Sequence, residues 1–104
     1  LLGLMLRNLV DNAVKYAPEN SPITVQLQAG EIAWQLSVRS LVGAVGFPDP
    51  ERVFGKYYRS PLAMRRSGLG LGLYWVRGAA RQLGGDAHYA RDQDYVVFTL
   101  CLPN

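Results

Sequence analysis

Asn8-Leu-Val-Asp-Asn12-Ala-Val-Lys15-Tyr16-Ala-Pro18 is the most informative segment of the chain, because it combines an apolar helical pattern with one polar stripe. At about 100° per residue, Asn8 and Asn12 lie roughly 40° apart on a helix, and Lys15 falls between and below them. Neutral amide oxygens suit a hard cation and an ammonium group suits phosphate, so the stripe indicates a magnesium-nucleotide site. The alternative is the solvated face of an amphipathic helix, whose opposite side is apolar at Leu2, Leu6, Leu9, Val10, Ala13 and Val14.

The length and charge of the chain limit what it can be. Its 104 residues, 49% of them hydrophobic, fit one core, and we expect a single domain over residues 1–104. These residues carry a net charge of +3, which favours an anionic ligand, and four arginines lie close together at Arg52, Arg59, Arg65 and Arg66. The arginines fall in one short segment with Gly, Ser and Pro rather than along a helix with interleaved aromatics. This is not the pattern of a nucleic-acid-binding protein.

The sequence carries no sign of an oxidising compartment or of a membrane. Cys101 is the single cysteine, so no internal disulfide can form, and no apolar run reaches the length of about 20 residues that spans a bilayer. The chain starts without Met, inside an apolar helical pattern and without a visible N-cap. We therefore expect a cytoplasmic, N-terminally truncated fragment of a longer protein, with no membrane contact of its own.

Hydrophobic periodicity predicts helices and strands in the proportions of an α+β fold. The expected elements are helices over 1–17, 50–58 and 68–83, and strands over 23–28, 32–40, 86–91 and 95–102. The first helix ends at Pro18, and Gly84-Gly85 ends the last one. This order predicts a two-layer α/β sandwich with helices on one face of a mixed, mostly antiparallel sheet.

Three motifs, in this order, resemble those of the sensor histidine kinases. The segment from Asn8 to Pro18 resembles their N box, Val53-Phe54-Gly-Lys-Tyr57-Tyr58-Arg59 resembles their F box, and Ser67-Gly68-Leu-Gly70-Leu71 resembles their second glycine box. Leu83-Gly84-Gly85 and the closing Leu102-Pro103 match the end pattern of the family. The resemblance covers nearly the whole chain. It implies the ATP-binding (Bergerat) fold shared with DNA gyrase, Hsp90 and the mismatch-repair protein MutL.

The resemblance implies a role for each residue of the polar stripe. Asn12 would hold Mg²⁺ through its side-chain oxygen, Lys15 would contact phosphate, and Asn8 would complete the polar wall. Where ATP-hydrolysing relatives place a glutamate, Asn8 is a neutral amide that cannot act as a general base, which favours phosphoryl transfer over hydrolysis. Asn8, Lys15 and Arg59 would form the catalytic set, with Arg59 approaching the terminal phosphate.

Further contacts with the nucleotide would come from segments on either side of the stripe. Tyr16 would pack near the nucleotide, and backbone N–H groups of the glycine turn at a helix start would bind the phosphates. The residues implied in ATP binding, beside Asn8, Asn12 and Lys15, are Tyr16, Ser40, Val42, Gly46, Phe47, Tyr58, Arg59, Ser67, Gly68, Leu69, Gly70 and Leu71.

The first glycine box departs from the family pattern. There an aspartate accepts a hydrogen bond from the adenine amino group, and glycines follow at the second and fourth positions after it. Counting back from Gly46 places the aspartate position at Val42, whereas strand phase places it at Ser40, and neither is a carboxylate. Ser40 could accept a hydrogen bond about 1 kcal/mol weaker than one to a charged acceptor, and Val42 could accept none. A second departure is Arg66, which stands where the family usually has glycine. The resemblance implies that Arg66 either stiffens the lid, the segment that carries Arg59, or adds a phosphate contact.

The resemblance implies the catalytic domain of a two-component sensor histidine kinase, which binds ATP and Mg²⁺ and passes a phosphate to a histidine on a separate dimerisation domain. Implied partners are that domain, in a homodimer, and a response regulator, and the location would be the cytoplasmic part of an inner-membrane receptor. His88 would not be the acceptor, since it falls in a predicted strand, and the fragment alone should not autophosphorylate. Two alternatives stay open: a degenerate domain of this fold that binds proteins rather than ATP, and an anti-sigma-factor serine kinase.

Overall fold

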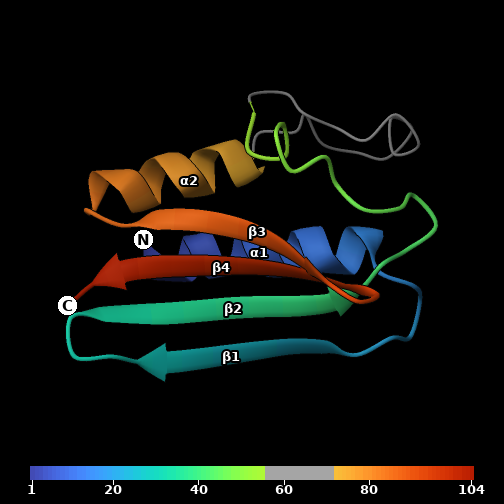
Figure 1. Ribbon diagram of the computed structural model, residues 1–104, viewed down its shortest axis with the longest axis horizontal. Helices are drawn as coiled ribbons and strands as arrows, with labels where there is room; N and C mark the ends of the chain where they lie inside the picture. Colours follow the sequence, from blue (N-terminus) through green and yellow to red (C-terminus); the bar gives the residue numbers. More distant parts are fainter. Residues whose placement is uncertain (56–71) are drawn as a thin grey trace.

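Four strands and two helices form the part of the chain that the computed structural model describes, residues 1–55 and 72–104. In chain order they are α1 (Leu2–Tyr16), β1 (Ile23–Ala29), β2 (Ala33–Leu41), α2 (Gly72–Gln82), β3 (Asp86–Asp92) and β4 (Tyr95–Pro103). The strands lie in the order β1-β2-β4-β3, and the helices form a second layer (Figure 1). The expected α+β two-layer fold is confirmed.

Every strand pairing between described residues is antiparallel, so this sheet is not mixed as expected. β1 and β2 form one hairpin and β3 and β4 form another, and the second strands of the two hairpins pair with each other, with Val38 opposite Phe98. β2 and β3 run in the same direction, but β4 lies between them. No two parallel strands are therefore neighbours in the described sheet.

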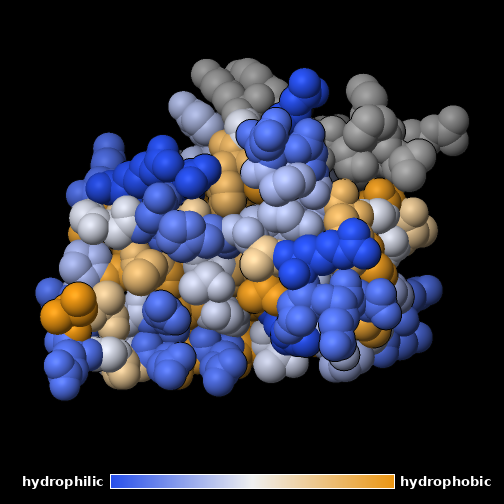
Figure 2. Space-filling view, viewed as in Figure 1, coloured by the Kyte–Doolittle hydropathy of each residue, from blue (hydrophilic) through white to orange (hydrophobic). Residues whose placement is uncertain are grey.

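One face of the sheet is apolar and covered by the helices. On α1 the buried side chains recur every four residues, at Met5, Leu9 and Ala13, which is the spacing of one helix face. The opposite face of the sheet is polar, and the Ser37 Oγ lies 3.2 Å from the Thr99 Oγ1 there. Figure 2, in the same view as Figure 1, shows hydrophilic side chains spread over the strands. The buried apolar residues are Met5, Leu9, Ala13, Leu36, Val38, Val53, Val76, Ala79, Ala80, Ala87, Phe98 and Leu100.

β1 is an edge strand that leaves apolar side chains in solvent. Val25 and Leu27 share the covered face with their cross-strand partners Val38 and Leu36. Both nevertheless stay exposed, at 46% and 58%, because α1 packs more on β2 than on β1. None of the seven residues of β1 carries a charge.

The short helix expected over 50–58 is not formed in its described part. Residues 50–55 make turns, with a single helical hydrogen bond from the Val53 N–H to the Asp49 carbonyl at 2.9 Å. The Asp49 Oδ1 accepts a hydrogen bond from the Glu51 N–H at 2.9 Å, as in an Asx turn. A segment this short forms too few helical hydrogen bonds to offset the cost of nucleation, and the burial of Val53 fixes it instead.

Asp86 joins α2 to the start of β3. Its Oδ1 accepts hydrogen bonds from the Nε atoms of Arg77 and Arg81, both at 3.1 Å, and from the Ala87 N–H at 2.8 Å. Burial raises the pKa of Asp86, but the hydrogen bonds from Arg77, Ala87 and Arg81 outweigh that effect and hold the pKa well below its usual range. The ionised carboxylate therefore stabilises the contact between helix and strand.

Asp86→Asn is expected to make the free energy of unfolding fall less steeply as the pH is lowered. Because the folded-state pKa is depressed, the carboxylate contributes stability that is complete above its unfolded-state pKa of about 3.9. That contribution is lost as the pH falls toward the folded-state value, and the neutral variant has none to lose. At neutral pH the variant should be about 1 kcal/mol less stable, since the partly exposed Arg81 weakens the interaction.

Denaturant unfolding of both proteins from about pH 7 to about pH 2 measures this difference. Asp11→Asn is the matched control, because Asp11 is 67% exposed on α1 and lies 3.8 Å from its partner Arg7. Equal slopes of stability against pH for the Asp86 variant and the wild type would contradict the assignment.

Candidate functional site

The polar stripe of α1 lies beside the core and is half-buried. Asn8, Asn12 and Lys15 are all intermediate in exposure. The Asn8 Nδ2 donates a hydrogen bond to the Leu4 carbonyl at 2.9 Å, which fixes the orientation of its amide. Within the described residues the Asn12 side chain makes no hydrogen bond, so no described group occupies its oxygen. The stripe is thus half-buried and not a fully solvated face.

α2 reaches this stripe at its first described residue. A Cβ at Gly72 would lie 3.0 Å from the Asn8 Oδ1, so a larger residue there would crowd the amide. The two helices pack against each other, and the end of α2 nearest Asn8 is its amino end. The dipole of a helix makes its amino end suitable for an anion. A neutral amide and a positive helix end therefore lie next to each other.

The loop that follows β2 is held against the carboxyl end of α1. A Cβ at Gly43 would overlap the carbonyl oxygen of Tyr16, so the two backbones are in direct contact. The Gly46 N–H donates to the Gly43 carbonyl at 3.0 Å, and the φ of Gly46 is +80°, a conformation that favours glycine. Tyr16 and Gly46, both predicted to contact nucleotide, are therefore near the end of α1 that carries Asn12 and Lys15.

The same loop is attached to the β3–β4 hairpin. The guanidinium carbon of Arg91 lies 3.8 Å from the centroid of the Phe47 ring. The Val42 N–H donates to the Asp94 carbonyl at 2.8 Å. No sequence pattern indicated Arg91 or Asp94, because each lies far along the chain from the loop residue that it contacts.

Ser40 lies on the covered face at the end of β2. It is 5% exposed, and its cross-strand neighbours are Ile23 and Val96. It shares the face of Val38, so its side chain is directed toward the helix layer. No Asp or Glu occurs from residue 40 to residue 47, so neither this strand end nor the loop provides a carboxylate.

Other predicted residues lie outside the described residues: Tyr58, Arg59, Arg66, Ser67, Gly68, Leu69, Gly70 and Leu71. In the part that is described, no group of three His, Cys, Asp or Glu residues could hold a metal ion. A cation at this site would rely on the Asn12 amide and on oxygens of the ligand itself, which is a common arrangement for Mg²⁺ with phosphates. No helix among residues 1–55 and 72–104 is long and apolar enough to cross a membrane.

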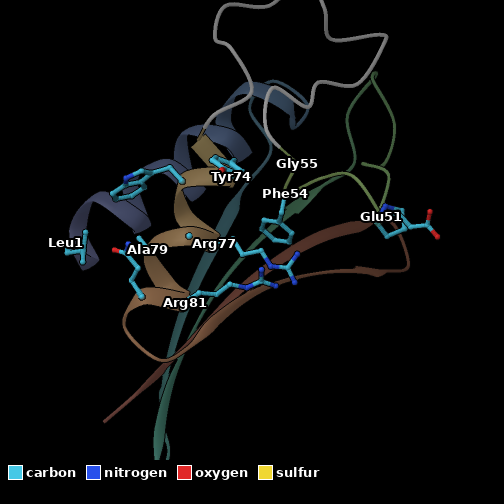
Figure 3. A pocket seen from close by; sticks show the side chains of 12 residues that line it. Leu1, Glu51, Phe54, Gly55, Tyr74, Arg77, Ala79 and Arg81 are labelled. Atoms are coloured by element: carbon cyan, nitrogen blue, oxygen red, sulfur yellow. The ribbon is translucent and has the colours of Figure 1, made fainter.

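A groove of about 620 Å³ lies beside α2, away from the polar stripe. Phe54, Tyr74, Arg77 and Arg81 line it (Figure 3). The guanidinium carbon of Arg77 lies 4.7 Å from the centroid of the Phe54 ring, and both arginines bind Asp86. Both arginines thus pair with Asp86 and hold α2 to β3.

Comparison with known proteins matches the chain to one family. The family described as histidine kinase-, DNA gyrase B-, and HSP90-like ATPase matches residues 1–104. The sensor histidine kinase HprS of Escherichia coli (strain K12) is 32% identical over 103 residues, which cover 99% of this chain and 23% of the relative. WalK of Bacillus subtilis (strain 168), also a sensor histidine kinase, is 34% identical over 86 residues, covering 79% of this chain and 14% of the relative.

Solved structures give the same result. The mycobacterial sensor histidine kinase MprB matches with a TM-score of 0.78 and 29% identity, covering 98% of this chain and 71% of that one. The catalytic domain of the histidine kinase ThkA matches with a TM-score of 0.76 and 27% identity, covering 95% of this chain and 64% of that one. The chain thus spans less than a quarter of the length of HprS and WalK and about two thirds of these structures.

Proposed function

The chain belongs to the family of histidine kinase-, DNA gyrase B-, and HSP90-like ATPases, and from this premise we propose that it binds Mg-ATP and serves a sensor histidine kinase as its catalytic domain. In that role it would pass the terminal phosphoryl group to a histidine on a dimerisation domain, and a response regulator would receive it next. The observation that carries the proposal is the half-buried amide and amine stripe of α1, which meets the amino end of α2 and the loop after β2.

The residues at this site fit a magnesium ion and a triphosphate. Bound Mg-ATP would supply a terminal phosphoryl group whose negative charge the metal ion partly neutralises. The Asn12 Oδ1 would hold the cation, since an amide oxygen is a hard ligand and this one has no other partner among the described residues. The Lys15 ammonium would attract the phosphates as a point charge. The amino end of α2 would add its dipole to the same attraction.

Asn8 would favour transfer over hydrolysis. Its amide is neutral and already bonded to the Leu4 carbonyl, so it cannot remove a proton from an attacking water. Phosphoryl transfer depends mainly on positioning and charge stabilisation, which this site can supply without a base. The proposed roles of Tyr58, Arg59 and the residues from Ser67 to Leu71 concern the part outside the described residues.

Calorimetric titration with ATP and with its non-hydrolysable analogue AMP-PNP, with and without magnesium, tests the proposal directly. We expect saturable, magnesium-dependent binding of both nucleotides and no phosphorylation of this chain by itself. In the whole protein, labelled phosphate should appear on a histidine outside this domain. An absence of binding at millimolar nucleotide would overturn the proposal and would favour a domain that binds other proteins.

Ser40→Asp is expected to increase the affinity for ATP relative to that for GTP. A serine hydroxyl both donates and accepts, so it can bond the amino group of adenine or the carbonyl of guanine, whereas a carboxylate only accepts. A charged acceptor is stronger by about 1 kcal/mol, so the variant should bind ATP about fivefold more tightly and GTP less tightly. Competition between the two nucleotides in calorimetry measures this ratio.

Val42→Asp tests the other possible position of the carboxylate, and Ser37→Asp is the control. Ser37 lies three residues before Ser40 but on the opposite face of the sheet, next to Thr99. A change in nucleotide preference with the Ser37 variant, or none with either of the other two, would contradict the placement of the base.

A further inference from the structure

We propose that Arg91 and the turn of the β3–β4 hairpin position the loop after β2, and with it the base of the bound nucleotide. The inference rests on the proposed function, because that function places residues 42–47 on the base side of the site. It adds to that function a positioning residue on β3, outside the three segments that resemble family motifs.

Two contacts attach the loop to the hairpin, one near each end. At the far end the Arg91 guanidinium carbon lies 3.8 Å from the centroid of the Phe47 ring, and a cation over the face of an aromatic ring is attracted by the ring's electrons. At the near end the Val42 N–H donates to the Asp94 carbonyl at 2.8 Å. Because both ends are held by the same hairpin, a movement of the hairpin would move the whole loop.

The hairpin turn has a backbone conformation that suits this task. Gln93 has a φ of +54°, in the left-handed region that residues with a Cβ seldom adopt. Its carbonyl accepts a long hydrogen bond from the Arg91 Nε at 3.4 Å, and the next carbonyl along the chain is the one that accepts from Val42. A positive φ at the first central residue is usual in a two-residue hairpin turn, and this turn carries the carbonyls that bind Arg91 and Val42.

On its other side the loop is pressed against α1. Gly43 has no room for a side chain beside the Tyr16 carbonyl, so the loop cannot move toward the helix. It therefore lies between the helix that carries Asn12 and the hairpin that carries Arg91. Loss of the Arg91 contact would free one side of the loop, and the base would lose its fixed position while the phosphate side stays intact.

Arg39 is a matched control within the same region. Its guanidinium carbon lies 4.0 Å from the centroid of the Tyr95 ring, and its Nη1 lies 2.7 Å from the Asp92 Oδ2. Like Arg91, Arg39 makes a cation–π contact, and it also makes an ion pair, but both contacts are with strand residues of the hairpin and not with the loop.

The test compares the affinities of Mg-ATP and of magnesium tripolyphosphate, which has no base, by calorimetry. Because Arg91 is exposed, Arg91→Ala should raise the Kd for Mg-ATP about two- to fivefold and leave the Kd for tripolyphosphate unchanged. Arg91→Lys keeps the charge without the planar group and should recover only part of the loss. Phe47→Leu should weaken Mg-ATP binding by itself, and adding Arg91→Ala to it should weaken binding no further. Arg39→Ala should stay within about twofold of the wild type.

Several results would overturn this positioning role. Arg91→Ala that binds Mg-ATP as tightly as the wild type would do so, and so would an equal loss of tripolyphosphate binding, which would indicate a general charge effect. An equal loss of Mg-ATP binding in Arg39→Ala would indicate general destabilisation of the hairpin. Failure of the wild-type chain to bind ATP would overturn the proposed function itself and is distinguished by the titration without any variant.

Discussion

Asn12→Ala is expected to abolish magnesium-dependent binding of ATP. Asn12 is half-buried on α1, and its amide has no other partner in the described part of the chain. Mg²⁺ in nucleotide sites has few protein ligands, so the loss of one greatly weakens the binding of the ion to the protein. The Kd for ATP in magnesium should rise at least about a hundredfold, which corresponds to about 3 kcal/mol.

This loss should not come from unfolding, because alanine is the better helix former. The free energy of unfolding should therefore stay within about 0.5 kcal/mol of the wild-type value. Asp11→Ala is the control on the neighbouring, exposed position. The useful quantity is the ratio of affinities with and without magnesium, and an unchanged ratio in the Asn12 variant would show that the cation is held elsewhere.

Gly43→Ala is expected to weaken both the fold and the nucleotide site. The added methyl group would overlap the Tyr16 carbonyl oxygen, and a backbone atom cannot rotate away as a side chain can. Overpacking of this kind costs about 1–3 kcal/mol of unfolding free energy, and we expect the upper end. The loop would have to leave α1, so the affinity for Mg-ATP should fall at least about tenfold in the protein that remains folded.

Two other glycines separate these effects. A Cβ at Gly85 would overlap the Cys101 carbonyl oxygen in the same way, but away from the loop, so Gly85→Ala should lose stability and keep its affinity. Gly78 has nothing within 4 Å of its added Cβ and lies within α2, so Gly78→Ala should gain up to about 1 kcal/mol. Urea unfolding and calorimetry on the three variants give the comparison. Equal affinities for Mg-ATP in the Gly43 and Gly85 variants would show that the loop after β2 does not contribute to the nucleotide site.

The sequence predicted most elements because their patterns are local. Helix α1 ends two residues before Pro18, and the alternation of Leu36, Val38 and Ser40 gave β2 its buried face. The helix expected over 50–58 is not formed in its described part, residues 50–55, because a propensity for helix in a short segment is weaker than the packing of one anchor, Val53. The expectation of a mixed sheet was wrong for the described strands. The order in which strands pair depends on which strand lies between two others, and no local pattern contains that information.

Part of the candidate site could likewise be predicted from local patterns, and part could not. Asn8, Asn12 and Lys15 were predictable, because their spacing on one helix fixes their relative positions. The approach of Gly72 to Asn8, and the contact between Arg91 and Phe47, join segments far apart in the chain. Two arginines one turn apart on α2, shortly before Asp86, were a sequence signal for the shared carboxylate, although this contact was not predicted.

The bare edge of the sheet has a consequence for the behaviour of the chain in solution. The seven residues of β1 carry no charge, and two of its apolar side chains face water. Natural sheets usually discourage edge-to-edge addition with charged residues, proline or a covering element, and none of these lies within β1. Self-association will therefore grow with protein concentration. Titrations at high protein concentration would then report self-association together with nucleotide binding, so dilute samples suit this chain better.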